Sequence, residues 1–197
     1  MEGPLEVKKT REDEEWLAEC NRLENLAGMI LAVPGPEPKT LTRLPLGLAG
    51  QIFGSAMPFG LYDPDGQLIQ ELKRAAVTTI VLLAEIEECR EKAGRDLVAL
   101  YKQEGLLVLS LPIPNYGIPP HESLGDTLTE TIARATQGEN ILIHCSAGIG
   151  RTPLFAALLA KKILGLSGIE AIRWIWQNKP DALLTPPQIL LIIEGEH

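Results

Sequence analysis

One short segment of this 197-residue chain combines a nucleophile, two glycines and an arginine; it covers residues 144–152 and reads His-Cys-Ser-Ala-Gly-Ile-Gly-Arg-Thr. Glycines allow successive backbone N–H groups to turn toward one anion. Arg151 offers a planar pair of donors that matches two phosphate oxygens. The positive field of such a loop favours the thiolate form of Cys145. The segment therefore predicts a phosphate site in which Cys145 attacks phosphorus and forms phosphocysteine.

The elements that must position this segment alternate between strands and helices. A short apolar strand, Ile141–His144, leads into Cys145, and the helix expected over residues 151–165 adds N-terminal donors and a favourable dipole. This alternation predicts an α/β fold with a central, mostly parallel sheet flanked by helices. Ligands of such sheets bind beyond the carboxyl ends of the strands. The other expected strands are Gln51–Met57, Thr78–Ala84 and Leu106–Ile113, and the other expected helices are Leu68–Ala75, Glu85–Gln103, Leu124–Thr136, 168–178 and 186–194.

Residues 1–40 differ from the rest of the chain and are expected to form an N-terminal helical appendage. Apolar residues recur there at helical spacing, and the helix should end before the proline-rich linker at 34–38, which cannot continue it. Residues 41–197, which contain the Cys145 segment, are expected to form one domain, since their size and the 45% hydrophobic content of the chain suit a single core.

Charge and cysteine content exclude several classes of protein. The chain has 18 Lys and Arg against 26 Asp and Glu, a net charge of −8, which disfavours nucleic acid as a partner. Three cysteines far apart in sequence indicate neither a disulfide scaffold nor a zinc site, but a reducing compartment. The longest apolar run, near Leu154–Leu166, is interrupted by lysines, so no membrane span is predicted. We expect a cytoplasmic protein that needs no metal or other cofactor.

The motif at residues 144–152 resembles the signature of the protein tyrosine phosphatase superfamily, Cys-x5-Arg-Ser/Thr. The order of strands and helices extends the resemblance over about residues 41–194. The chain is short and lacks the phosphotyrosine-recognition loop of the larger enzymes, so it is most similar to the compact dual-specificity group. Residues 51–190 look closest to the cyclin-dependent-kinase-associated branch. The resemblance implies hydrolysis of phosphoprotein monoesters, with phosphotyrosine favoured and phosphoserine and phosphothreonine as further substrates.

The resemblance also implies roles for single residues. Cys145 is the expected nucleophile and Arg151 the expected phosphate ligand. Thr152 is expected to hydrogen-bond the cysteine sulfur and ease its departure, and His144 either orders the loop or is a structural histidine. Gln188 is expected to place the hydrolytic water, with an ordinary solvent-facing helix position as the alternative. Backbone N–H groups for phosphate are expected from Ser146, Ala147, Gly148, Ile149 and Gly150.

The general acid of the family is replaced in this chain. Residues 111–120, Leu-Pro-Ile-Pro-Asn-Tyr-Gly-Ile-Pro-Pro, resemble the family's acid loop, with Asn115 where Asp is expected. An amide cannot deliver a proton, and losing a general acid lowers the rate by about 10²–10⁴-fold. Three interpretations stay open: another group supplies the proton, the protein binds phosphorylated partners with slow turnover, or an Asp-to-Asn substitution was introduced to trap substrate. The candidate replacement acids are Asp63, Asp65, His121, Glu122 and Asp126.

Overall fold

The computed structural model describes residues 41–195, whose strands form one five-stranded sheet in the order β1-β2-β5-β3-β4. β5 is the central strand and pairs in parallel with β2 on one side and β3 on the other. β4 pairs in parallel with β3, and only β1, at the other edge, is antiparallel to its neighbour. The strands are Thr42–Leu44 (β1), Ile52–Ser55 (β2), Val77–Leu82 (β3), Leu107–Ser110 (β4) and Asn140–His144 (β5).

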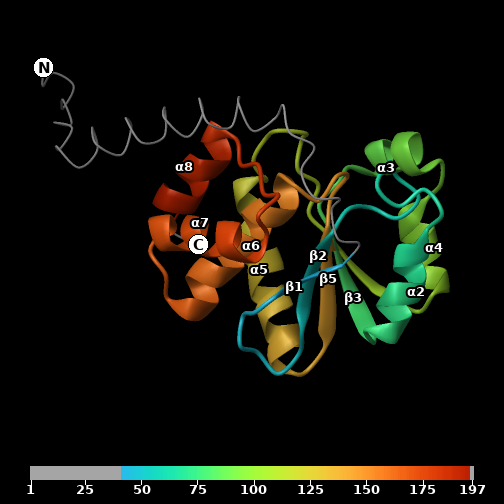
Figure 1. The fold of residues 1–197 in the computed structure, drawn as a ribbon, viewed down its shortest axis with the longest axis horizontal. Helices are drawn as coiled ribbons and strands as arrows, with labels where there is room; N and C mark the ends of the chain where they lie inside the picture. The colour runs from blue at the N-terminus through green and yellow to red at the C-terminus, as the bar shows by residue number, and fades with distance from the viewer. Residues whose placement is uncertain (1–40, 196–197) are drawn as a thin grey trace, which may run out of the picture. The chain divides into compact units, whose positions relative to one another are not determined.

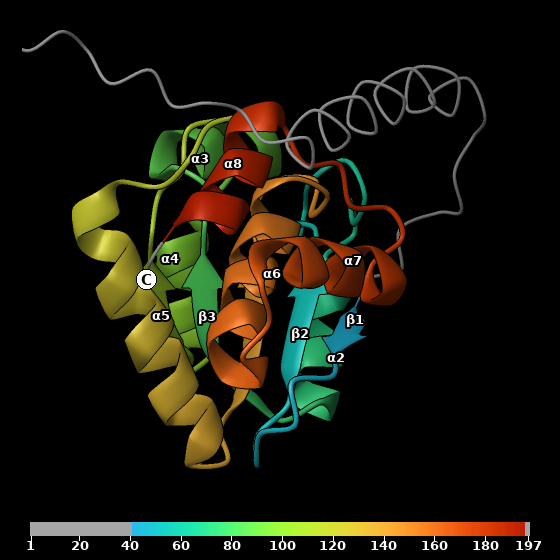
Figure 2. The ribbon, with the colours of Figure 1, turned by 90° about the vertical axis from the view of Figure 1, so that its left-hand side faces the viewer.

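Helices cover both faces of this sheet. Figure 1 shows α2, α3 and α4 on one face and α5 to α8 on the other, and Figure 2 shows the second group in front of the strands. The mostly parallel α/β architecture predicted from the sequence is therefore confirmed. The helices are Gln67–Arg74 (α2), Ile86–Ala93 (α3), Leu97–Gln103 (α4), His121–Thr136 (α5), Arg151–Leu164 (α6), Gly168–Asn178 (α7) and Pro186–Glu194 (α8).

Two hydrophobic clusters hold these layers together, one on each face of the sheet. Side chains of a strand alternate between its faces. Accordingly, Ile141 and Ile143 of β5 belong to the cluster with α5, α6, α7 and α8, and Leu142 belongs to the cluster with α2, α3 and α4. All three side chains are fully buried, and burial of each contributes about 1.5–3 kcal/mol. β5 is thus fixed from both sides at the point where its chain leaves the sheet.

Some sequence expectations differ from the structure. The single helix expected over Glu85–Gln103 is wrong, because Gly94 takes a left-handed conformation (φ 66°) that ends α3. Asp96 then starts α4 by accepting a hydrogen bond from the backbone N–H of Ala99 at 3.0 Å. The three-residue strand β1 was not predicted. The helix and linker expected within residues 1–40 lie outside the described residues. Within residues 41–195, no helix is long and apolar enough to cross a membrane.

Candidate active site

The segment singled out by sequence lies at the carboxyl end of the central strand. β5 ends at His144, in register with Ser55 of β2 and Leu82 of β3, and residues 145–150 form a loop that leads directly into α6. We call residues 145–150 the phosphate loop. Its backbone is bonded to its surroundings: the N–H of Met57 donates to the carbonyl of Ser146 (2.9 Å), and that of Leu183 donates to the carbonyl of Ile149 (2.7 Å).

Two donors converge on the sulfur of Cys145. The backbone N–H of Gly148 and the hydroxyl of Thr152 each lie 3.3 Å from Sγ. Gly148 has φ +79°, and a Cβ there would lie 2.6 Å from the carbonyl oxygen of Ser55. Only glycine therefore fits this position without displacing the end of β2. Both donors therefore reach the atom that the sequence predicts to be the nucleophile.

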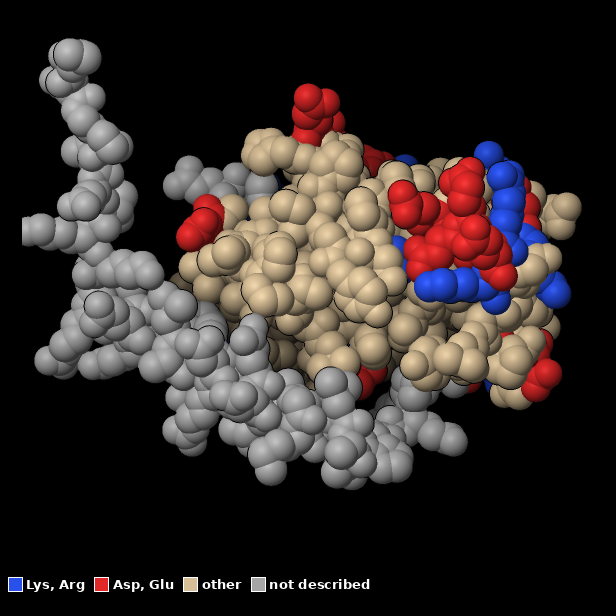
Figure 3. All heavy atoms as spheres, turned by 90° about the horizontal axis from the view of Figure 1, so that it is seen from above, with Lys and Arg blue, Asp and Glu red and all other residues tan. Residues whose placement is uncertain are grey.

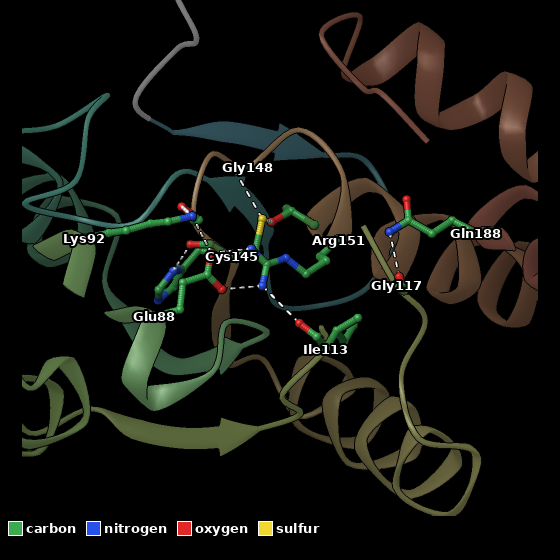
Figure 4. Close-up of polar contacts among 11 residues, drawn as sticks. Glu88, Lys92, Ile113, Gly117, Cys145, Gly148, Arg151 and Gln188 are labelled. Carbon is green, nitrogen blue, oxygen red and sulfur yellow. Dashed lines mark hydrogen bonds and ion pairs between the residues drawn. The ribbon is translucent and has the colours of Figure 1, made fainter. Parts of the chain in front are cut away.

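Arg151, the first residue of α6, is almost fully buried beside this sulfur. Its Nη1 donates to Oε2 of Glu88 (2.6 Å) and to the carbonyl of Ile113 (3.0 Å), and its Nη2 donates to Oε1 of Glu88 (2.8 Å) (Figure 4). Burial alone would lower the pKa of Arg151, but Glu88 and Cys145 outweigh it and raise this pKa above its ordinary value. The guanidinium is therefore a permanent, oriented cation.

Glu88 and Lys92 of α3 complete the charged part of the site, and neither was expected from the sequence. Nζ of Lys92 donates to Oε1 of Glu88 (2.7 Å) and to Oγ of Ser146 (3.1 Å). Burial raises the pKa of Glu88, yet Arg151 and Lys92 overcome this effect and lower it to about 2. The i, i+4 spacing of the pair is visible in the sequence. Its proximity to the phosphate loop follows from the pairing of β3 with β5, which the sequence does not show.

His144 supports the loop from beneath. Its Nδ1 lies 3.0 Å from the carbonyl oxygen of Cys145, and its Nε2 lies 2.8 Å from the hydroxyl of Tyr101. Because a carbonyl only accepts, Nδ1 carries the proton and Nε2 accepts from Tyr101. Burial is the main reason that the pKa of His144 falls from 6.5 to about 4. The imidazole is therefore neutral at pH 7 and holds the loop by hydrogen bonding.

Asn115 lies in an exposed turn of the acid loop. The N–H of Gly117 donates to the carbonyl of Pro114 (2.9 Å), which closes the turn, and Tyr116 adopts φ +63° within it. Such a left-handed conformation is strained for an aromatic residue. Arg151 holds one end of this segment through Ile113. Arg151 is therefore bonded to the segment that carries Asn115.

The start of α8 holds the other end of the turn. Nε2 of Gln188 donates to the carbonyl of Gly117 (2.8 Å), and Oγ1 of Thr185 donates to the carbonyl of Tyr116 (3.1 Å). Oε1 of Gln188 accepts from the N–H of Thr185 (3.1 Å), so both ends of the amide are engaged. Gln188 is 1% exposed, so it is not a solvent-facing residue. The structure brings it to the acid loop.

The other candidate acids have different surroundings. Asp63 is buried, and its carboxylate accepts from the backbone N–H groups of Gln67 (2.8 Å) and Leu68 (3.1 Å), so it serves the start of α2. Asp65 lies exposed in the turn that precedes α2. The remaining candidates, His121, Glu122 and Asp126, lie exposed on α5.

Comparison with known proteins agrees with the resemblance seen in the motif. A family model described as "Polymorphic toxin system, DSP-PTPase phosphatase" matches residues 59–163. Protein tyrosine phosphatase type IVA 2 of Mus musculus is 31% identical over 115 residues, which cover 57% of this chain and 64% of that protein. Cyclin-dependent kinase inhibitor 3 of Rattus norvegicus is 30% identical over 90 residues, which cover 46% and 42%. The chain thus spans less than two thirds of the length of these curated relatives.

Solved structures share the fold. Kinase associated phosphatase, crystallised with a serine in place of its catalytic site cysteine, is 22% identical, with a TM-score of 0.71 over 81% of this chain and 94% of that one. Tk-PTP in its active form is 25% identical, with a TM-score of 0.64 over 79% of this chain and 98% of that one. The expected likeness to compact dual-specificity phosphatases is confirmed.

Proposed function

The chain belongs to the DSP-PTPase phosphatase family, and from this premise we propose that it hydrolyses phosphoprotein monoesters through a phosphocysteine intermediate. Phosphotyrosine is the favoured substrate, with phosphoserine and phosphothreonine next. The observation that carries the proposal is the convergence of Gly148 N–H and Thr152 Oγ1 on the sulfur of Cys145, beside Arg151. A thiolate with these donors and a fixed guanidinium has the parts that covalent phosphoryl transfer requires.

In the first step, the sulfur of Cys145 attacks phosphorus, the S–P bond forms and the ester P–O bond breaks. Arg151 and the backbone N–H groups of the phosphate loop hold the equatorial oxygens. The outward hydrogen bonds of the Ser146 and Ile149 carbonyls support this role, because they leave the concave side of the loop to its N–H groups. The residues that bind phosphate in this proposal are Ser146, Ala147, Gly148, Ile149, Gly150 and Arg151.

In the second step, water attacks phosphorus, the P–S bond breaks and inorganic phosphate leaves. The hydroxyl of Thr152, 3.3 Å from Sγ, stabilises the departing thiolate. In this proposal Gln188 places the water, because its amide keeps a second N–H and a second lone pair beside its bonds to Gly117 and Thr185. A Cβ at Gly150 would lie 4.0 Å from Oε1 of Gln188, so this side chain lies next to the phosphate loop.

Asn115 shapes the substrate preference in this proposal. Without a protonated side chain at this position, the leaving oxygen departs as an anion or takes its proton from solvent. A tyrosine phenol, with a pKa of about 10, tolerates this far better than the more basic alkoxide of serine or threonine. The chemistry at residue 115 therefore favours aryl phosphates.

A second candidate function rests on the same residue. A phosphate-dependent binding protein with slow turnover would keep Cys145 and Arg151 and lose the acid, as this chain does at Asn115. It would recognise phosphorylated proteins through the loops around the phosphate loop, chiefly 58–66 and 114–123.

The decisive experiment measures phosphate release from a phosphotyrosine peptide by the full chain, with Cys145→Ser as the blank. We expect release that the substitution abolishes while peptide binding persists. Release that survives in Cys145→Ser would refute the nucleophile. Tight binding of the peptide with no release above the blank would instead establish the binding function.

A further inference from the structure

A lysine outside the signature motif reaches the phosphate loop from α3. Nζ of Lys92 lies 3.1 Å from Oγ of Ser146, the first residue after the nucleophile, and 2.7 Å from Oε1 of Glu88 (Figure 4). A lysine ammonium has three donors and these contacts use two. The side chain is 44% exposed, so its charge lies at the rim of the loop rather than in the core.

The charge of Arg151 is largely cancelled where it is held. Both oxygens of Glu88 lie within 2.8 Å of its guanidinium, and the low pKa of Glu88, about 2, keeps that carboxylate ionised. Arg151 and Glu88 together are therefore neutral. A phosphate monoester enters as a dianion beside a sulfur that the mechanism requires as a thiolate, so further positive charge is needed at the loop.

Lys92 supplies that charge through the same carboxylate. Oε1 of Glu88 accepts hydrogen bonds from both Nη2 of Arg151 and Nζ of Lys92. Two cations therefore share one carboxylate, and the three groups together carry a net charge of +1. The neighbours of Lys92 on α3 do not add to this charge, because Glu87 and Glu91 are acidic and Arg90 is paired with Asp96 (3.2 Å) and Glu87 (3.9 Å). Figure 3 shows acidic side chains gathered over α3 with basic side chains beside them.

We propose that Lys92 is an affinity-determining residue for the phosphate group: it offsets Glu88, so that Arg151 keeps its attraction for the substrate dianion, and it fixes this charge at the loop through Ser146. The proposal rests on the proposed phosphatase pocket and adds to it a residue from α3. It assigns Lys92 to substrate binding and not to the bond-making steps. Its removal therefore raises KM more than it lowers kcat.

The test is calorimetric titration of the full chain with tungstate, an inert oxyanion of phosphate shape, for wild type and three variants. Lys92→Met should weaken tungstate binding about 2- to 5-fold, the scale of one partly exposed ion pair. Lys92→Arg should restore most of the affinity. Lys162→Met, an exposed lysine of α6, is the matched control and should bind as wild type does. The difference in tungstate affinity between wild type and Lys92→Met should become smaller in 1 M salt, because salt screens the charge of Lys92.

Kinetics with a phosphotyrosine peptide complete the test. In Lys92→Met, KM should rise by the same factor as the dissociation constant for tungstate. The kcat of this variant should stay within about twofold of wild type. Equal tungstate affinity in wild type and Lys92→Met would overturn the role of Lys92 and leave the phosphatase proposal standing. Wild type that binds no tungstate would instead overturn the phosphate pocket itself. Failure of Lys92→Arg to recover affinity would overturn the charge argument.

Discussion

Gln188 donates its side-chain amide to the carbonyl oxygen of Gly117 over 2.8 Å, and this bond joins the start of α8 to the turn that carries Asn115. The turn is held a second time by Thr185, whose hydroxyl donates to the carbonyl of Tyr116. Its other side is held by Arg151 through Ile113. The acid loop is thus hydrogen-bonded both to Arg151 and to the start of α8.

The first prediction concerns Gln188→Met, which keeps the size of the side chain and removes its donor and acceptor. It leaves the carbonyl of Gly117 and the N–H of Thr185 without this partner, so we expect a loss of about 1–3 kcal/mol in the free energy of unfolding. Urea denaturation measures this. If Gln188 also places the water, phosphocysteine should accumulate, seen as a burst of dephosphorylated peptide in rapid-quench experiments.

A loss of stability with no burst would restrict Gln188 to fastening the acid loop. Unchanged stability would show that the bond to Gly117 contributes nothing. Thr185→Val is the matched variant, since it removes the hydroxyl bond to Tyr116 and leaves the bond of Gln188 to Gly117 in place.

The sequence predicted those parts of the fold whose hydrophobic pattern is visible within a single strand or helix. β5 is recognisable as a short apolar strand, and its alternation of Ile141, Leu142 and Ile143 between two clusters follows from strand geometry. The break between α3 and α4 was missed because Gly94 lies among charged residues that also fit one continuous helix. β1 was missed because three residues carry too little periodicity to distinguish a strand.

Residue types and spacing alone predicted the site only where its parts are contiguous in sequence, whereas Asn115 and Gln188 were identified by resemblance to the family. Cys145, Gly148, Arg151 and Thr152 lie within eight positions, and the structure places the last three around the sulfur of the first. Glu88 lies 63 positions from Arg151. Its contact depends on strand order, which one sequence does not determine. The same holds for Lys92, which was part of an unremarkable charged helix.

The second prediction concerns Asn115→Asp. If no other group donates the proton, this change should speed the hydrolysis of phosphoserine peptides by about 10²–10⁴-fold. It should hardly change the hydrolysis of p-nitrophenyl phosphate, whose leaving group needs no proton. The measurement is kcat/KM across aryl and alkyl phosphates of graded leaving-group pKa. An equal effect on all of them would argue against a missing acid at residue 115.

The third prediction concerns Thr152, whose hydroxyl lies 3.3 Å from Sγ of Cys145. Thr152→Val keeps the shape of this fully buried side chain and removes the donor, so the thiolate becomes a poorer leaving group from phosphocysteine. We expect the second step to slow by about tenfold, on the scale of one hydrogen bond to a charged group. Trapping of phosphocysteine by acid quench should show its accumulation. Thr152→Ser, which keeps the hydroxyl, should behave as wild type; the same accumulation in both variants would contradict the role.

The fourth prediction concerns the buried imidazole of His144, whose pKa falls from 6.5 to about 4, chiefly through burial. Between these two values the unfolded chain binds a proton at this position and the folded chain does not, so acid favours unfolding. The stabilisation is fully present above pH 6.5 and is lost as the pH falls toward 4. The change amounts to roughly 3 kcal/mol.

Urea denaturation between pH 7.5 and pH 4.8 should follow most of this decline before carboxylates such as Glu88, with a pKa of about 2, contribute. His144→Gln, which keeps a donor and an acceptor but cannot titrate, should be less stable at pH 7.5 yet show a flatter dependence on pH. An equally steep decline in that variant would assign the acid sensitivity to groups other than His144.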